Sequence, residues 1–278
     1  MKTAIVTGAS SGMGKVTAKY LAKEGYHTIL VARNKLKAQS VQTEILQSNP
    51  HAKVDLLIAD LSDINQLKSL ANEILHHYQQ IDVLVNNAGA YFGSRKESKN
   101  GIELTLATNH IPYYYLTKQL IPLLTKALKA RVVFVASEAH NFAKPNLDNL
   151  QLKQGYKPML AYANSKLYNI ITCLYFAREF KQSNILFNAM HPGGVNTGFA
   201  KDAKGMVGFI FRVLKFMLRT PEKGADTILW LATGKETLNY NGKYFYDRKQ
   251  IKAQSVAYDV DFQKRLILLT EDLINNAS

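Results

Sequence analysis

The alternation of strand-like and helical segments is the feature that most constrains the fold of this chain. Short apolar runs that indicate strands occupy residues 3–9, 27–33, 53–61, 81–89, 130–137, 185–193 and 242–245. Helical patterns lie between them, over residues 14–25, 35–49, 64–80, 101–129 and 161–181. Apolar strands that alternate with helices are typical of a parallel sheet covered on both faces. We therefore expect an α/β fold, a single doubly wound domain over residues 1–278, with ligands beyond the carboxyl ends of the strands.

The composition agrees with a globular protein. Apolar residues make up 47% of the 278 residues, which is enough for a large core. The sequence contains no run of about 18 apolar residues, so it predicts no membrane-spanning helix. The opening "MKTAIVTGAS" runs from a strand pattern into a glycine-rich turn, unlike a signal peptide, and the single Cys173 excludes an internal disulfide. We expect a cytoplasmic protein with Cys173 buried in its core.

The chain is basic, with a net charge of +14 from 35 basic and 21 acidic residues. A basic surface can serve nucleic acid, an anionic membrane or anionic small molecules. Neither zinc-finger spacing nor an RNA-binding aromatic motif is present, so nucleic acid is not an expected partner. The histidines are scattered, and we expect no metal site.

A glycine-rich turn links the first strand to the first helix in "TGASSGMGK", residues 7–15. Its glycines are Gly8, Gly12 and Gly14. Glycines allow a tight turn and let backbone N–H groups and a helix N-terminus approach a pyrophosphate, although they also mark ordinary turns. The strand before it and the helix after it favour a dinucleotide site.

The end of the second strand indicates which dinucleotide binds. Enzymes that use NAD usually place an acid here for the ribose 2′-hydroxyl, whereas this chain has Ala32 and Arg33, with Lys35 and Lys37 nearby. An arginine fork matches a 2′-phosphate, so NADP(H) is preferred over NAD(H). The alternative is that Arg33 begins a solvated helix. Asp60 would accept a hydrogen bond from the adenine amino group, or else cap a helix that begins at Ser62.

The segment "AYANSKLYNI", residues 161–170, places Tyr162 and Lys166 one helical turn apart. Side chains at this spacing share a face of a helix. A free tyrosine has a pKa of about 10, and a neighbouring cation favours its phenolate. Lys166 would supply that cation. The alternative is a solvated helix face on which the two residues meet by chance.

Taken in order, these motifs resemble the short-chain dehydrogenase/reductase family. The resemblance rests on the glycine turn, "NNAG" at 86–89, the Tyr162 and Lys166 pair, and "HPGGVNT" at 191–197. It covers nearly the whole chain and implies a Rossmann-like fold. Segments similar to the retinol-dehydrogenase-like branch are 107–117, 135–140, 161–167 and the C-terminal portion "RTPEKGADTILWLAT" with "NGKYF".

The resemblance implies a catalytic set of four residues. Tyr162 would be the general acid in reduction and the general base in oxidation, and Lys166 would also bind the nicotinamide ribose. Ser137 would hold the substrate oxygen beside Tyr162. Asn109 would maintain a helix irregularity and a water in the proton relay. Taken singly, Ser137 and Asn109 are also common turn or cap residues.

The resemblance also implies a cofactor-binding set at the ends of the strands. Its members are Gly8, Ser10, Ser11, Gly12, Met13, Gly14, Arg33, Asp60, Leu61, Asn87, Ala88, Gly89, Tyr162, Lys166, Pro192, Gly193, Val195 and Thr197. Some NADP-dependent relatives carry a basic residue just before the second glycine. Here that residue is Ser11, so the prediction of NADP(H) depends on Arg33.

The substrate side lies mostly outside the motifs. Candidate wall residues are 90–92, 140–142, Tyr156 and Met159. A substrate-lid segment is expected at about 198–220. Within it, residues 205–218 could instead make weak contact with a membrane surface, because Arg212, Lys215 and Arg219 form a basic stripe beside an apolar face. The apolar and aromatic character predicts a small lipophilic carbonyl or alcohol substrate.

Three classes of function remain open from the sequence, one of which, a peripheral membrane protein that uses 205–218 as an anchor, is compatible with catalysis. The first is an NADP(H)-dependent oxidoreductase that transfers a hydride between nicotinamide and its substrate. The second is a nucleotide-binding regulatory protein of the same fold without turnover. Family members often form homodimers through the helices that correspond to 101–129 and 161–181. The last residues of the chain, 261–278, are expected to form a helix that covers an apolar surface or a partner.

Overall fold

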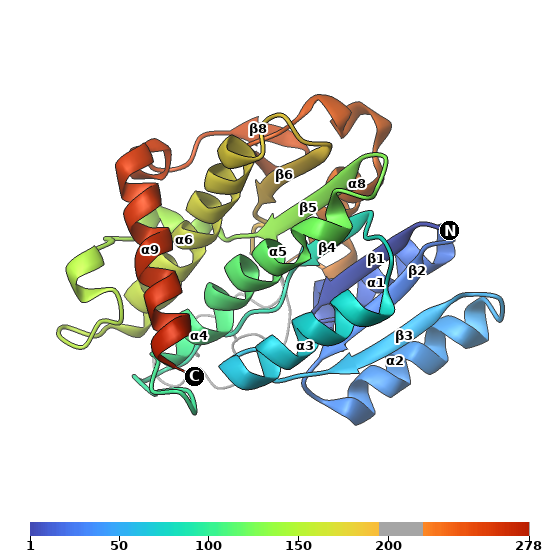
Figure 1. Ribbon diagram of the computed structural model, residues 1–278, viewed down its shortest axis with the longest axis horizontal. Helices are drawn as coiled ribbons and strands as arrows, with labels where there is room; N and C mark the ends of the chain where they lie inside the picture. Colours follow the sequence, from blue (N-terminus) through green and yellow to red (C-terminus); the bar gives the residue numbers. More distant parts are fainter. Residues whose placement is uncertain (195–218, 278) are drawn as a thin grey trace.

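The computed structural model describes residues 1–194 and 219–277, which form one sheet with helices on both faces (Figure 1). The strand order is β3-β2-β1-β4-β5-β6-β7-β8. The strands are β1 (Thr3–Thr7), β2 (His27–Ala32), β3 (Val54–Ile58), β4 (Val83–Asn86), β5 (Ala130–Val135), β6 (Ile185–Met190), β7 (Lys243–Tyr246) and β8 (Lys249–Ile251). All neighbouring strands pair in parallel except β8, which is antiparallel to β7. The predicted doubly wound sheet is confirmed, and β8 is an addition that the sequence pattern did not show.

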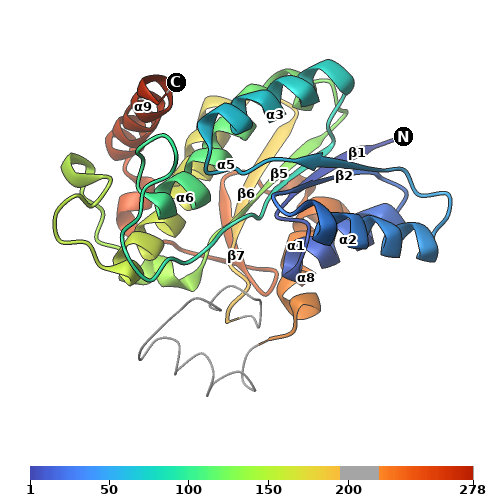
Figure 2. The same cartoon turned by 90° about the horizontal axis from the view of Figure 1, so that it is seen from below.

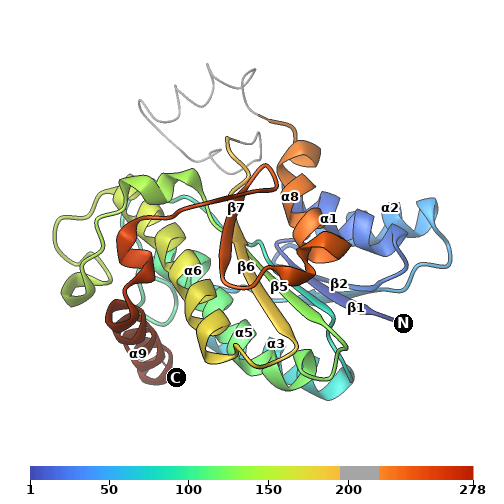
Figure 3. The ribbon, with the colours of Figure 1, turned by 90° about the horizontal axis from the view of Figure 1, so that it is seen from above.

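Two layers of helices enclose the sheet (Figures 2 and 3). One layer contains α1 (Gly12–Lys23), α2 (Lys35–Ser48) and α8 (Pro221–Thr233). The other contains α3 (Ile64–His77), α5 (Ile111–Leu124) and α6 (Pro158–Glu179), with α9 (Val260–Asn276) outside it against α6. Shorter elements are α4 (Leu104–Asn109), η1 (Glu138–Phe142), η2 (Leu147–Asn149), η5 (Lys235–Asn239) and η6 (Ser255–Tyr258). Within the described ranges, no helix combines the length and apolar character needed to cross a bilayer.

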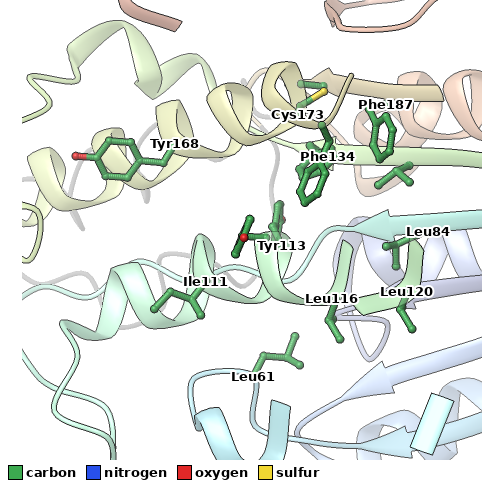
Figure 4. Close-up of a cluster of buried hydrophobic side chains, with 14 of the residues drawn as sticks. Leu61, Leu84, Ile111, Tyr113, Leu116, Leu120, Phe134, Tyr168, Cys173 and Phe187 are labelled. Atoms are coloured by element: carbon green, nitrogen blue, oxygen red, sulfur yellow. The ribbon is translucent and has the colours of Figure 1, made fainter. Parts of the chain in front are cut away.

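The two faces of the sheet are both apolar because successive side chains of a strand point to opposite sides. In β1, Ile5 belongs to the core under α3, α5 and α6, whereas Ala4 and Val6 belong to the core under α1 and α8. The larger core includes Tyr113, Phe134, Phe187 and Cys173 (Figure 4). Cys173 is fully buried, as its apolar neighbours in the sequence predicted.

The expected helix over 101–129 is two helices that meet at His110. Glu103 begins α4 by accepting hydrogen bonds from the backbone N–H groups of Thr105 and Leu106, both at 2.8 Å. Pro112 lies in the first turn of α5, where its missing N–H costs nothing. The continuous apolar pattern concealed this break, which places Asn109 at the end of α4.

The last helix packs on its own chain. His110 bonds Thr270 at 3.0 Å, and the carboxylate of Glu271 accepts from both Tyr114 and Lys118 on α5. Leu266, a residue of α9, is fully buried. The expectation that a terminal helix covers an apolar surface is therefore confirmed, with α5 and α6 of the same chain as that surface.

Candidate active site

The predicted site residues gather at one edge of the sheet. Between β1 and β4 the strand order reverses direction, and such a switch point leaves a crevice at the carboxyl ends of the strands. The loops that follow β1, β2, β3, β4, β5 and β6 carry Gly8 to Gly14, Arg33, Asp60 and Leu61, Asn87 to Gly89, Ser137, and Pro192 with Gly193. Val195, Thr197 and residues 205–218 lie outside the described residues.

The glycine turn has the close packing that a phosphate cradle needs. Gly8 and Gly12 have φ of +68° and +54°, in the left-handed region that side chains disfavour. A Cβ at Gly14 would lie 2.3 Å from the backbone oxygen of Gly8. Ser11 caps α1 without a side-chain hydrogen bond, so no side chain occupies the N–H groups of the first turn. These features fit the pyrophosphate of a dinucleotide.

Thr7 ties the glycine turn to the loop after β4, a role that the sequence analysis missed. Its hydroxyl accepts hydrogen bonds from the backbone N–H groups of Asn87 and Ala88 at 2.9 and 3.0 Å. The amide of Asn87 in turn donates to the backbone oxygen of Thr7 at 2.8 Å. The only available signal was the position of Thr7 directly before Gly8. These bonds fix the two loops on either side of the crevice.

Arg33 is available to an anionic ligand. Its side chain is 74% exposed and lies 3.5 Å from the carboxylate of Asp60. Asp60 also accepts hydrogen bonds from the backbone and hydroxyl of Ser62, at 3.0 and 2.7 Å. The alternative of Asp60 as a helix cap is wrong, because α3 begins at Ile64 and Asp63 caps it. The charges of Arg33 and Asp60 thus meet at the edge where an adenine ribose would lie.

Ser137 and Tyr162 are joined across the crevice. Ser137 follows β5 and caps η1, where its oxygen accepts from the backbone N–H of Ala139 at 3.2 Å. Burial raises the pKa of Tyr162 to about 12, and a hydrogen bond with Ser137 acts in the opposite direction. A hydrogen bond that lowers the pKa of a tyrosine stabilises its phenolate, so Ser137 can donate its proton to the Tyr162 oxygen while its own oxygen accepts from Ala139. Ser137 is therefore both a cap residue and a partner of Tyr162.

Lys166 lies deep beside Tyr162 on α6. Its ammonium nitrogen is 5.7 Å from the centre of the Tyr162 ring and 5.6 Å from that of Tyr113. Its one hydrogen-bond acceptor among the described protein atoms is the backbone oxygen of Val135, at 3.1 Å. Burial lowers the pKa of Lys166 to about 7. The pKa of Tyr162 lies above that of a free tyrosine because the side chain is buried, whereas a neighbouring cation was expected to lower it.

Asn109 joins three parts of the site. Its side-chain oxygen accepts a hydrogen bond from the backbone N–H of Ala90 at 2.8 Å. Its amide nitrogen donates to the backbone oxygen of Ala90 at 3.0 Å and to the hydroxyl of Ser165 at 3.1 Å. Ser165 donates to the backbone oxygen of Tyr162 at 2.7 Å. Asn109 thus connects the end of α4, the loop after β4 and the helix that carries Tyr162.

Gly89 lies against two of the predicted catalytic side chains. A Cβ at this position would be 3.2 Å from the Lys166 nitrogen and 3.3 Å from the Asn109 oxygen. The glycine therefore lets the loop after β4 approach both side chains closely. The Lys166 nitrogen and the Asn109 side-chain oxygen consequently both lie beside the Cα atom of Gly89.

Beyond β6, a cluster that the sequence did not reveal holds the loop of Pro192 and Gly193. His191 stacks on Tyr246 with ring centres 4.4 Å apart. The guanidinium of Arg219 lies 4.8 Å from the same ring and forms a forked ion pair with Asp247. Arg219 was predicted to belong to a basic stripe with Arg212 and Lys215, and the structure shows that its charge is paired with Asp247. The two other members of that stripe lie outside the described residues.

The candidate substrate wall is aromatic near Tyr162. The Tyr91 ring meets the Tyr162 ring edge-on, with centres 6.0 Å apart. Phe142 is 69% exposed, and Met159 is partly exposed at the start of α6. His140 is buried and bonds Ser137, so it supports the loop and contributes little to a wall.

Comparison with known proteins agrees with this geometry. The family model described as short chain dehydrogenase matches residues 2–207. Human retinol dehydrogenase 11 is 31% identical, over 98% of this chain and 86% of its own. Human retinol dehydrogenase 14 is 29% identical with the same coverage of 98% and 86%, and human polyprenol dehydrogenase is 31% identical over 95% and 82%.

Solved structures agree as well. An uncharacterised protein from Mycobacterium paratuberculosis superposes with a TM-score of 0.80 at 27% identity, over 99% of this chain and 94% of its own. A short chain dehydrogenase from Shigella flexneri, solved with NADP, gives 0.68 at 25% identity, over 88% and 95%. Fold and site together define a doubly wound α/β protein of Rossmann type. The chain belongs to the short-chain dehydrogenase/reductase family of oxidoreductases, in its retinol-dehydrogenase-like branch.

Proposed function

We propose that this chain is an NADP(H)-dependent oxidoreductase that transfers a hydride between nicotinamide and a lipophilic carbonyl or alcohol. The observation that carries the proposal is the contact of Ser137 with Tyr162, one helical turn from buried Lys166 and beside the glycine turn. The bound cofactor supplies or accepts the hydride. The protein binds, orients and moves a proton.

Each side chain has a defined task in reduction. Ser137 donates a hydrogen bond to the substrate oxygen and holds it beside Tyr162. Tyr162 gives its proton to that oxygen as negative charge develops. Lys166 retains protons beyond the one bonded to Val135, and with these it binds the ribose and stabilises the phenolate. Asn109 keeps α6 and the loop after β4 in place through Ser165 and Ala90.

The cofactor preference follows from Arg33. Its exposed guanidinium after β2 suits a 2′-phosphate, and no acid directly follows Ala32 to bind a ribose hydroxyl. The structure from Shigella flexneri solved with NADP supports this preference. The rest of the predicted cofactor set stays a prediction, including Val195 and Thr197.

The lipophilic substrate is supported by two observations. Tyr91 contacts Tyr162, Met159 lies one turn before it on α6, and Phe142 is an exposed aromatic residue in η1. The names of two human relatives, retinol dehydrogenase 11 and polyprenol dehydrogenase, indicate lipophilic alcohols as their substrates. Cytoplasmic location, a homodimer, a lid at 198–220 and membrane contact through 205–218 stay predictions.

The test is NADPH oxidation, followed by absorbance, with a panel of lipophilic aldehydes, ketones and quinones. Tyr162→Phe should lose at least about a hundredfold of the turnover while still binding NADPH, since it removes the proton donor. Tyr175→Phe, on the same helix but away from Ser137, is the control and should keep full activity. Full activity of Tyr162→Phe would refute the mechanism. Binding of NADPH without turnover of any substrate would favour a regulatory protein.

A further inference from the structure

The buried face of α6 carries a polar stripe that continues beyond the proposed catalytic residues. Tyr162, Ser165, Lys166, Asn169 and Thr172 follow one another at intervals of three, one, three and three residues, so they share one side of the helix. Asn169 and Thr172 have no exposed surface. A stripe of this kind is unusual in a helix packed on both sides, because buried polar groups are costly unless they are hydrogen-bonded.

The two halves of the stripe differ in their partners. Ser165 bonds Asn109, and Lys166 bonds Val135. One turn further, neither amide atom of Asn169 has a hydrogen-bond partner among the described residues. The Thr172 hydroxyl has none among these residues either.

Across from this half lies His110, at the junction of α4 and α5. It is fully buried, and its Nδ1 also has no hydrogen-bond partner in the part of the chain that the structure describes. Asn169 interacts with the His110 ring, so the three unpartnered atoms of these two residues belong to one interior region between the junction, α6 and α9, and Thr172 lies about one turn further along the same side of α6.

The protonation of His110 follows from its other nitrogen. Nε2 lies 3.0 Å from the Thr270 hydroxyl, which donates its single proton to the backbone oxygen of Leu266 at 2.8 Å. Nε2 must therefore donate to Thr270. Burial lowers the pKa of His110 to about 3, and a contact with the Asn169 side chain that does not reach hydrogen-bond geometry acts in the opposite direction, so the ring is neutral near pH 7 and Nδ1 is an acceptor. It needs a donor.

We propose that ordered water molecules occupy this region, bonded to His110 Nδ1, the Asn169 amide and the Thr172 hydroxyl. A buried water usually has two to four polar partners, and these atoms supply both donors and acceptors. A direct bond between Asn169 and His110 would satisfy at most two of the four atoms. Water can satisfy all of them.

The water site holds α6 against the α4–α5 junction. Asn169 lies one turn beyond Ser165 and Lys166, and His110 directly follows Asn109. Asn169 is therefore a positioning residue: through α6 it sets the location of Tyr162. This consequence for catalysis rests on the proposed function, whereas the water site itself does not.

Two substitutions of Asn169 separate a hydrated region from a dry one. In a dry region Asn169→Ala leaves a cavity, so it should destabilise more than the similarly sized Asn169→Leu. In a hydrated region water fills the space in Asn169→Ala, whereas Asn169→Leu expels water and leaves His110 and Thr172 unpaired. We expect Asn169→Leu to have the lower melting temperature, by about 3 °C or more. The opposite order, or equal values, would overturn the proposal.

A pair of threonines provides a matched control. Thr17 on α1 and Thr172 on α6 are both fully buried in helices, and both hydroxyls lack a partner. Thr17 has no other unpartnered side chain of the described residues within one turn of it in sequence. Thr17→Val should therefore be neutral or stabilising, and Thr172→Val should lower the melting temperature because its hydroxyl binds water. Equal effects of the two substitutions would contradict the water site.

Activity and crystallography complete the test. Asn169→Leu should lower kcat about tenfold with little change in KM for NADPH, and Asn169→Ser, which keeps room for water, should restore most of it. A high-resolution crystal structure should show water within hydrogen-bonding distance of His110 Nδ1. A dry region there refutes the site even if Tyr162→Phe behaves as predicted. An unchanged kcat in Asn169→Leu refutes the positioning role alone.

Discussion

The ammonium nitrogen of Lys166 and the backbone oxygen of Val135 are joined by a hydrogen bond of 3.1 Å. Val135 ends β5, and Ser137 follows two residues later, so this bond fixes Lys166 to the strand that delivers Ser137. The bond does not offset the burial of Lys166, whose pKa falls to about 7. A lysine with this pKa changes charge near neutrality, and folding must then depend on pH.

We expect the free energy of unfolding to rise from about pH 7 to about pH 9. The unfolded chain keeps its lysine protonated in this range, whereas the folded chain loses the proton of Lys166 as the pH passes the folded pKa of about 7. The unfolded state thus binds more protons, and its disadvantage grows with pH, by about 2 kcal/mol over this range. Urea unfolding at both pH values measures it. Lys166→Met should remove the rise, and the exposed Lys37→Met should keep it.

Gly14→Ala should abolish tight NADPH binding without unfolding the protein. The new Cβ would meet the Gly8 oxygen at 2.3 Å, so the turn must open. An overpacking cost of about 1–3 kcal/mol corresponds to roughly 5- to 150-fold weaker binding. Fluorescence titration measures the affinity.

Gly155→Ala is the control for Gly14→Ala. Gly155 has a φ of +66°, and a Cβ at this position would meet no neighbouring atom within 4 Å. The substitution should therefore cost some stability, because of the backbone conformation, but no NADPH affinity. Unchanged affinity in Gly14→Ala would show that the turn is an ordinary one.

Arg33→Ala should weaken NADPH binding about 10- to 100-fold and leave NADH binding almost unchanged. The reason is the loss of a charged hydrogen bond to the 2′-phosphate, which only NADPH carries. Lys37→Ala, also exposed after β2, should have a much smaller effect. An equal loss for both cofactors would refute the assignment of Arg33.

Much of the fold was predictable because parallel strands and their helices leave separate patterns in sequence. The glycine turn, Tyr162 and Lys166 were equally visible, since their spacing is local. The break at His110 was not, because apolar residues continue on both sides of it and only Pro112 marks the new helix. The three residues of β8 carry no apolar alternation that could have identified it.

Contacts between distant segments were the main source of error. Arg219 was predicted to be part of a basic stripe because positions 212 and 215 are also basic, and its ion pair was not foreseen. Its partner Asp247 lies 28 residues away and meets it only when β7 is in the sheet. Thr7 and Asn87 are 80 residues apart, and only the pairing of β1 with β4 brings them together. Local sequence patterns contain no information on such pairs.

The cluster of His191, Tyr246, Arg219 and Asp247 leads to the last prediction, which concerns the loop of Pro192 and Gly193. The backbone N–H of Arg219 donates to Gly194 at 2.8 Å, and a Cβ at Gly193 would lie 3.2 Å from Arg219 Nε. Arg219 therefore packs directly on this loop while Asp247 holds its fork. Arg219→Met should raise the KM for NADPH about tenfold, because the loop is predicted to contact the cofactor.

Arg248→Met is the matched control for Arg219→Met. Arg248 lies next to Asp247 in the turn between β7 and β8 but pairs with Asp226 on α8, so its loss should leave the KM for NADPH unchanged. Both ion pairs are partly exposed, and neither substitution should change the melting temperature by more than a few degrees. Steady-state kinetics of the two variants decides the point. Equal KM values would show that Arg219 only stabilises the turn between β7 and β8. A rise in KM for Arg219→Met but not for Arg248→Met would extend the cofactor site to a residue that only the tertiary structure reveals.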